Sequence, residues 1–203
     1  ESDFHGVIDL ITMKAILFEG EHGENMVQAD IPAEQLESAS AYREQMLDAI
    51  SLFSDELTEA ILDEQVTEEL IHQAIRNGAL SLQLTPVLLG SAYKNKGVQK
   101  LLDAVCHYLP SPQDITTVAL DLDRQEAEVP LKTAPDLSLV MLTFKLEVSR
   151  YGQLTYVRIY QGVLNKGDTI VNMRTGKKTK VGRIIRMHAD QMEDIESAHA
   201  GAI

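Results

Sequence analysis

The first third of the chain carries two different spacings of apolar residues. Residues 7–11 and 15–18 are short apolar runs rich in β-branched side chains, which predicts two strands, and a third short strand is expected near Met26. From residue 36 to residue 53 the apolar positions recur three and four apart. This period predicts a helix that begins at 32–34, with proline and acid in its first turn.

Two more helices are expected before residue 80. Ser54 and Thr67 are residues that cap helix N-termini well, and each precedes an apolar pattern with helical spacing. The second of these helices is predicted to end at Asn77-Gly78, because glycine commonly follows a helix. The front of the chain is therefore expected to be a small α+β unit.

The middle of the chain predicts a strand, a loop and a helix. Residues 86–89 form a continuous apolar run, which is typical of a strand buried on both faces, and the run stops at Gly90-Ser91-Ala92. The next apolar residues follow the period of an amphipathic helix that docks on a sheet: Val98, Leu101, Leu102, Val105 and Leu109. Such a strand and helix form half of a βαβ unit, whose ligands lie beyond the carboxyl end of the strand.

The last third changes to a period of two. Residues 113–137 contain acids and prolines without an apolar period, which predicts a linker. Alternating residues from 138 onwards, with a hairpin signal at 174–177, predict short antiparallel strands. The chain stops at Gly201-Ala202-Ile203 in what resembles the start of a strand. We therefore expect residues 138–203 to be an antiparallel β-barrel that is incomplete.

Charge separates the two ends of the chain. The net charge is −13 overall. Residues 1–80 hold 18 acidic and 3 basic residues, residues 81–137 hold 7 and 5, and residues 138–203 hold 6 and 10. The acidic front and the basic back predict two surfaces with two kinds of partner.

Several classes of protein are excluded or disfavoured by composition. No apolar run approaches the length of a membrane-spanning helix, and Glu1-Ser2-Asp3 does not begin a secretory signal. Because the first residue is not methionine, the chain is expected to be a piece of something longer. The single cysteine, Cys106, cannot form an internal disulfide, and we expect it to be a small core residue, like Met46 and Met141.

Common catalytic and metal-binding patterns are absent or incomplete. The sequence contains no Gly-x-x-x-x-Gly-Lys-Ser/Thr loop for phosphates. Asn95-Lys96-Gly97-Val98 lacks the aspartate that reads guanine in GTPases, and Gly90-Ser91-Ala92 lacks the second glycine of a nucleophile elbow. His188, near Asp190, Glu193 and Asp194, is better explained by a solvated acidic turn than by a metal site.

A basic set of residues is the main candidate for nucleic-acid contact. It falls on and beside the predicted hairpin and consists of Arg174, Lys177, Lys178, Lys180, Arg183 and Arg186. Alternation would place Lys178 and Lys180 on one face, and Lys177 and Arg183 on the other. Composition alone does not choose between phosphate contact and a lysine-protected edge hairpin.

Long motifs resemble translation elongation factor G. The first runs from Gly90 to Gln99 as GSAYKNKGVQ and continues as LDAV at 102–105 and YLPSP at 108–112. The second covers Tyr151 to Arg158 as YGQLTYVR, followed by YQG at 160–162 and KGDT at 166–169. The third includes RMHAD at 186–190 and MED at 192–194. The residues of the second and third motifs are most similar to those of the family branch that includes mitochondrial translocases and some bacterial paralogues.

The resemblance implies a multi-domain fold for an interior fragment of that factor. Residues 1–82 resemble the α+β insert subdomain of its GTPase domain. Residues 83–112 resemble the last strand and helix of that α/β P-loop GTPase domain, and 113–137 is the linker. Residues 138–203 resemble the β-barrel second domain, here truncated.

The resemblance also implies site residues. Ser91, Ala92, Tyr93 and Lys94 match the fifth guanine-binding motif. A backbone N–H near Ala92 would meet the guanine carbonyl oxygen, the Ser91 hydroxyl would brace the loop, and Tyr93 would pack beside the base. The family's phosphate loop, switches, catalytic histidine and Mg²⁺ ligands have no counterpart here. GTP or GDP and Mg²⁺ therefore belong to the full-length protein, and this chain alone is expected neither to bind GTP tightly nor to hydrolyse it.

The full-length family member couples GTP hydrolysis to ribosomal movement of tRNA and mRNA. The resemblance implies that the acidic insert faces the ribosomal stalk protein and that the barrel faces small-subunit rRNA, with no membrane contact. Bacterial cytoplasm is the expected compartment, with the mitochondrial matrix as the alternative. Two alternatives for function stay open: a related translational GTPase for recycling, release or ribosome protection, and a stand-alone ribosome-binding adaptor.

Overall fold

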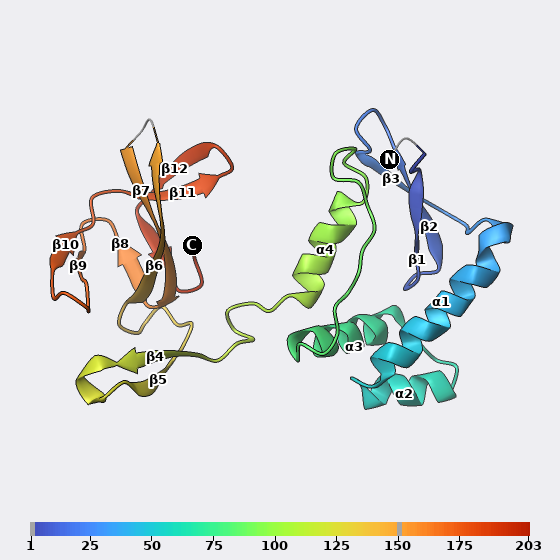
Figure 1. The fold of residues 1–203 in the computed structure, drawn as a ribbon, viewed down its shortest axis with the longest axis horizontal. Coiled ribbons are helices and arrows are strands. Elements are labelled where there is room, and N and C mark those ends of the chain that lie inside the picture. The colour runs from blue at the N-terminus through green and yellow to red at the C-terminus, as the bar shows by residue number, and fades with distance from the viewer. Residues whose placement is uncertain (1–2, 150–151) are drawn as a thin grey trace. The chain divides into compact units, whose positions relative to one another are not determined.

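The structure is a computed structural model that describes residues 3–149 and 152–203. Glu1, Ser2 and Tyr151, which the sequence motifs include, lie outside the described residues. The chain divides into two compact units, Glu1–Leu109 and Pro110–Ile203. The first is blue to green and the second yellow to red in Figure 1. This division places residues 83–109 in one unit with the front of the chain, without a separation at residue 82.

The first unit opens with a three-stranded antiparallel sheet. Its strands are β1 (Gly6–Asp9), β2 (Lys14–Glu19) and β3 (Asn25–Ala29), with β2 in the centre. Ile16 and Phe18 of β2 are buried on one face, as the apolar run predicted. The three strands expected from the sequence are therefore confirmed.

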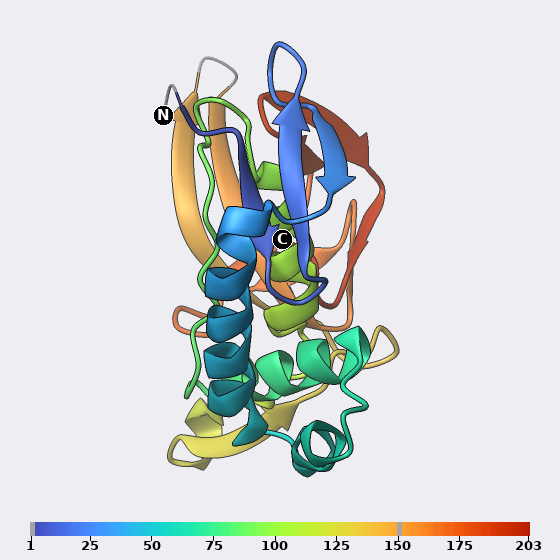
Figure 2. The same ribbon diagram turned by 90° about the vertical axis from the view of Figure 1, so that its right-hand side faces the viewer.

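Four helices complete the first unit. They are α1 (Ala33–Ser51), α2 (Asp55–Leu62), α3 (Glu68–Leu80) and α4 (Val98–Tyr108). Ser54 and Thr67 cap α2 and α3, as predicted, by accepting hydrogen bonds from the backbone N–H groups of Leu57 and Leu70. Helix α1 runs from the end of the sheet to α2 and α3 (Figures 1 and 2). Among the described residues, no helix is both long and apolar enough to cross a membrane.

The core of the first unit joins all four helices. Ile50 of α1, Leu57 of α2, Ile71 of α3 and Ala104 of α4 are buried together in one cluster. Met46 packs against this cluster, as expected. Burial of several aliphatic side chains at about 1.5–3 kcal/mol each holds the helices together.

Gly78 corrects the predicted end of α3. The helix continues past Asn77-Gly78 to Leu80, and Gly78 is buried inside it. A Cβ atom at this position would lie 2.8 Å from Cδ2 of Phe53 and 2.9 Å from Cβ of Leu84. The glycine therefore permits close packing within the helix and does not end it.

The predicted strand at 86–89 does not form in this chain. Val87 and Leu89 are 83% and 73% exposed, and no strand pairs with this run within residues 3–149 and 152–203. The stripe of α4 that was expected to dock on a sheet is likewise exposed at Leu101 and Leu102, while Ala104 and Tyr108 face α3. A parallel strand needs neighbouring strands, and without them the run stays extended and unpaired.

Cys106 corrects a second expectation about α4. Its side chain is exposed, whereas the sequence placed it in the core. Val105, the residue before it, is exposed as well. Both expectations assumed that residues 86–89 form a strand beside α4, and no such strand forms among the described residues.

The second unit begins with structure where the sequence predicted a linker. Strands β4 (Thr117–Asp121) and β5 (Ala127–Leu131) form an antiparallel hairpin around a short 3₁₀ turn, η1 (Leu122–Arg124). Val118, Leu120 and Val129 are exposed, so the hairpin has little apolar burial to signal it in the sequence. Pro130 lies within β5 opposite Val118, a position that proline occupies on edge strands.

The remaining strands pair as antiparallel ribbons. The longest joins β6 (Val140–Ser149) to β7 (Gly152–Gln161) with register shifts near Met141 and Lys145. The others are β8 (Val163–Asn165) with β13 (Ser197–His199), β9 (Thr169–Val171) with β10 (Lys178–Lys180), and β11 (Ile184–His188) with β12 (Gln191–Ile195). Ile159, Leu164 and Ala198 form their shared core, against which Met141 packs as expected.

Candidate functional site

The loop between residues 90 and 97 is closed by its own backbone. The N–H of Ser91 donates to the carbonyl oxygen of Lys96 at 2.8 Å, and the N–H of Lys96 donates back to Ser91 at 3.0 Å. Gly97 then begins α4 with a φ of 83°, a conformation that glycine adopts without strain. A Cβ atom on Gly90 would lie 2.7 Å from the Lys96 carbonyl oxygen, so the first glycine permits this closure.

The loop leaves the backbone N–H of Ala92 facing outward, while Ser91 is buried beneath it. The Ser91 side chain is buried, and its hydroxyl accepts a hydrogen bond from the N–H of Lys94 at 3.4 Å. Ala92 is exposed, and its N–H makes no hydrogen bond within the described part of the chain. Tyr93 is 86% exposed, with the Lys94 ammonium 5.7 Å from its ring centroid. A planar ligand edge could therefore meet a free N–H beside an aromatic ring.

Contacts that the sequence did not indicate attach this loop to the sheet. The Lys96 ammonium donates to the carbonyl oxygen of Phe4 at 2.6 Å. Lys100 of α4 forms a 3.2 Å ion pair with Asp9 of β1. At Gly23, in the turn between β2 and β3, a Cβ atom would lie 2.9 Å from the carbonyl oxygen of Lys94. Phe4, Asp9 and Gly23 have no sequence spacing that links them to residues 90–100.

The sequence has no phosphate loop, and within residues 3–149 and 152–203 no three histidine, cysteine or acidic side chains are grouped to hold a metal ion. Ligands for a triphosphate or its Mg²⁺ are therefore not recognisable among the residues that the structure describes.

The six basic candidates fall into two groups. Lys178 and Lys180 lie on β10, and Arg174 and Lys177 lie in the turn before it; all four are exposed, and none forms an ion pair among the described residues. Together these four residues are called the basic hairpin below. This placement on one hairpin agrees with the sequence pattern.

Arg183 and Arg186 are placed elsewhere. Arg183 precedes β11 and donates two hydrogen bonds to the Asp194 carboxylate, one from Nε to Oδ1 and one from Nη2 to Oδ2, the latter at 2.7 Å. This pairing lowers the pKa of the Asp194 carboxyl. Arg186 lies opposite Glu193 in the β11–β12 register, and Glu193 also contacts His188 at 3.1 Å. The expected alternation of Lys177 with Arg183 is therefore wrong, because the chain leaves β10 before Arg183.

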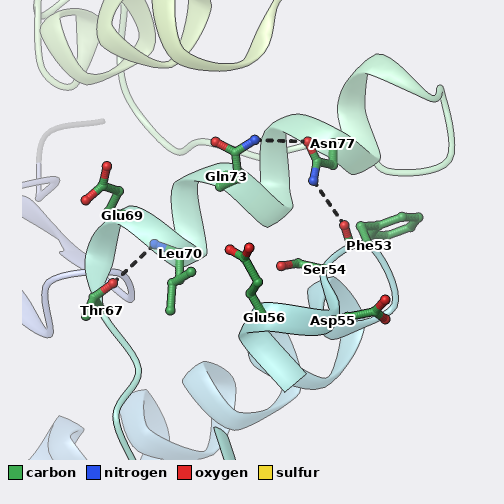
Figure 3. A pocket seen from close by; sticks show the side chains of 9 residues that line it. All are labelled: Phe53, Ser54, Asp55, Glu56, Thr67, Glu69, Leu70, Gln73 and Asn77. Carbon is green, nitrogen blue, oxygen red and sulfur yellow. Dashed lines mark hydrogen bonds between the residues drawn. The ribbon is translucent and has the colours of Figure 1, made fainter. Parts of the chain in front are cut away.

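The acidic front of the chain contains a groove between α2 and α3. Its volume is about 560 Å³, and Figure 3 shows its side chains. Carboxylates come from Asp55, Glu56 and Glu69, while Phe53 and Leu70 supply apolar surface. The sequence identified the neighbouring caps but gave no sign that the two helices enclose a groove.

Comparison with known proteins gives the family context of these sites. Residues 152–203 match the family described as Elongation factor Tu domain 2. A crystal structure of a protein from Thermus thermophilus superimposes with a TM-score of 0.71 and 25% identity, covering 97% of this chain and 27% of that one. The second unit therefore has the antiparallel, barrel-like fold of that family.

Relatives match the chain from end to end. Elongation factor G 1 of Syntrophus aciditrophicus (strain SB) is 54% identical over 100% of this chain and 29% of its own length. Elongation factor G 1 of Desulfotalea psychrophila is 54% identical over 100% of this chain and 30% of its own length, and that of Borreliella afzelii is 56% identical over 98% and 29%. The chain thus spans about three tenths of the length of these relatives. By sequence it is related over its whole length to elongation factor G, which confirms the resemblance carried by its motifs.

Proposed function

We propose that the chain is part of a ribosome-dependent GTPase that couples GTP hydrolysis to movement of tRNA and mRNA. The main support for this proposal is the 54% sequence identity to elongation factor G 1 of Syntrophus aciditrophicus, which extends over the entire chain and so over both units. The matched relatives are more than three times as long, so the complete activity belongs to the larger protein. All three relatives described above are elongation factor G, which favours this function over a release factor or a separate adaptor.

In this proposal the loop at 90–97 holds the guanine end of the nucleotide. Ser91 fixes the loop, the free N–H of Ala92 donates to the guanine carbonyl oxygen, and Tyr93 and Lys94 border the base. One backbone hydrogen bond to an exposed ligand contributes about 1 kcal/mol. Such a contact is too weak to retain a nucleotide by itself, so this chain alone neither binds GTP tightly nor hydrolyses it.

Charge supports two contacts with the ribosome. Residues 1–80 carry 15 more acidic than basic residues, which suits a basic surface on a partner protein. The resemblance to elongation factor G points to the ribosomal stalk protein as that partner. The basic hairpin offers four cations that form no ion pair with any described residue, and such cations suit the phosphates of small-subunit rRNA. Because the relatives described above are bacterial, the proposed site of action is the bacterial cytoplasm.

A titration of this chain with the isolated C-terminal domain of the ribosomal stalk protein tests the proposal. We expect saturable NMR shifts on the helices of the first unit that weaken at higher salt. A fluorescent GDP analogue added to the same sample should show no tight binding. Absence of stalk-domain shifts at millimolar partner, or tight nucleotide binding, would contradict the assignment of roles.

A further inference from the structure

The groove between α2 and α3 has fixed walls. The side-chain amide of Asn77 donates to the carbonyl oxygen of Phe53 at 3.1 Å, and Gln73 donates to Asn77 at 3.3 Å (Figure 3). Ser54 and Thr67 use their hydroxyl oxygens to cap the two helices. The neutral polar groups around the groove therefore already have partners within the chain.

The carboxylates that line the groove have no such partners among the described residues. Asp55, Glu56 and Glu69 are exposed and form no ion pair anywhere in residues 3–149 and 152–203. From residue 52 to residue 75 there are seven acidic residues and no lysine or arginine. Neighbouring side chains therefore do not neutralise the groove.

Helix ends offset only part of this charge. The N-termini of α2 and α3 border the groove, and each carries the equivalent of about half a positive charge. Three full negative charges against two such helix ends leave the groove negative by about two charges. Helix stabilisation accounts for acids in the first turns, but it does not account for a hollow with apolar surface beside them.

We propose that this groove binds a lysine or arginine side chain from an amphipathic segment of a partner protein. Phe53 and Leu70 would contact the aliphatic stem and an apolar neighbour, while Glu56 and Glu69 would bind the cationic head. A metal ion fits less well, because no three acidic, histidine or cysteine side chains of the described residues are grouped for coordination. The inference rests on the proposed docking role of the acidic front and narrows it to one groove.

A labelled peptide tests the inference directly. The probe is a helical peptide with lysine and leucine along one face, titrated into the full chain and followed by fluorescence anisotropy. Glu56→Gln combined with Glu69→Gln should weaken binding about tenfold. The matched control, Glu37→Gln combined with Glu44→Gln on exposed positions of α1, changes the net charge equally and should alter affinity less than about twofold. Equal losses in both variants would overturn the proposal in favour of a general acidic field.

A second variant separates shape from charge. Gln73→Trp fills the groove without changing the charge, and it should abolish most peptide binding while circular dichroism shows intact helices. Unchanged binding by this folded variant would overturn the proposal. The same variants are then titrated with the stalk domain. If the variants bind the stalk domain as well as the original chain does, the groove inference fails and the proposed function stands. If the original chain does not bind the stalk domain, the proposed function fails, and the peptide titration still decides whether the groove binds a basic segment.

Discussion

The Tyr108 hydroxyl lies 2.7 Å from Nδ1 of His72, so one hydrogen bond joins the last turn of α4 to the middle of α3. The two rings also stack, with centroids 5.8 Å apart. Burial raises the pKa of Tyr108 to about 12, and Asp9 adds to this shift. Tyr108 is therefore neutral at physiological pH and holds α4 in place although the apolar stripe of that helix is uncovered.

Tyr108→Phe should destabilise the first unit by about 1 kcal/mol, because it removes this hydrogen bond and keeps the ring. Urea unfolding followed by helical circular dichroism measures the change. Tyr42→Phe is the matched control, since Tyr42 is 59% exposed on α1 and makes no hydrogen bond in the described residues. Equal effects of the two substitutions would show that the Tyr108 hydroxyl contributes nothing specific.

Stability should also fall in mild acid because of His72. Burial lowers the pKa of His72, and repulsion from His107, whose ring centroid is 4.8 Å away, lowers it further. The negative charges of Asp9 and Glu68 raise this pKa, but the lowering effects are larger. The unfolded chain, with a histidine pKa of about 6.5, therefore binds the proton more readily than the folded chain. The stabilising contribution is fully present above about pH 6.5 and declines as the pH falls below it.

Urea unfolding midpoints measured at several pH values test whether stability falls in mild acid, and an NMR titration of the His72 ring tests whether its pKa is lowered. His107→Gln removes one cause of the lowered pKa, so His72 should titrate at higher pH in that variant and the acid-dependent loss should be smaller. An NMR pKa for His72 above about 6.5 in the unmodified chain would contradict the argument.

Local chemistry makes the helices of the first unit predictable. Ser54 and Thr67 cap helices through contacts with residues three positions later, and such short-range signals are visible in sequence. The loop at 90–97 is predictable for the same reason, because its glycines and serine act within eight residues of one another. The attachment of Lys96 to Phe4, by contrast, spans 92 residues and leaves no local pattern.

Sequence patterns mislead where the partner that a residue needs is distant in sequence or does not pair with it among the described residues. Val87 and Leu89 have the composition of a buried strand, but a strand forms only beside other strands. The expectation that Cys106 lies in the core is wrong for the same reason. The β4–β5 hairpin is missed for a different reason. Val118 and Val129 are exposed, so the hairpin has no buried face and its sequence lacks the alternation of apolar and polar residues that predicts a strand.

Gly78→Ala should destabilise the first unit by about 1–3 kcal/mol from overpacking, although alanine favours helices by about 1 kcal/mol. The new methyl group would meet Phe53 and Leu84 at less than 3.0 Å. Ser38→Ala, at an exposed position in α1, introduces the same residue without a contact and should be neutral or slightly stabilising. Thermal unfolding followed by circular dichroism compares them. A stabilised Gly78→Ala variant would mean that α3 shifts freely away from Phe53.

Reversing charge on the basic hairpin should weaken ribosome association and flatten its salt dependence. Lys177 and Lys178 are exposed and unpaired among the described residues, so each is free to replace counterions on phosphate. Lys177→Glu combined with Lys178→Glu should reduce the slope of log affinity against log salt by about 0.7–0.9 for each phosphate that the chain no longer neutralises.

The control reverses two lysines of the same unit outside the hairpin, Lys132→Glu and Lys166→Glu. It changes the net charge equally, and Lys166 is already paired with Glu196 at 2.8 Å. Binding of labelled chain to small ribosomal subunits across a salt series gives both slopes. If the hairpin provides the phosphate contacts, only the first variant flattens the slope. An unchanged slope in that variant, or the same flattening in the control, would remove the hairpin as the point of contact and leave only the overall charge of the second unit.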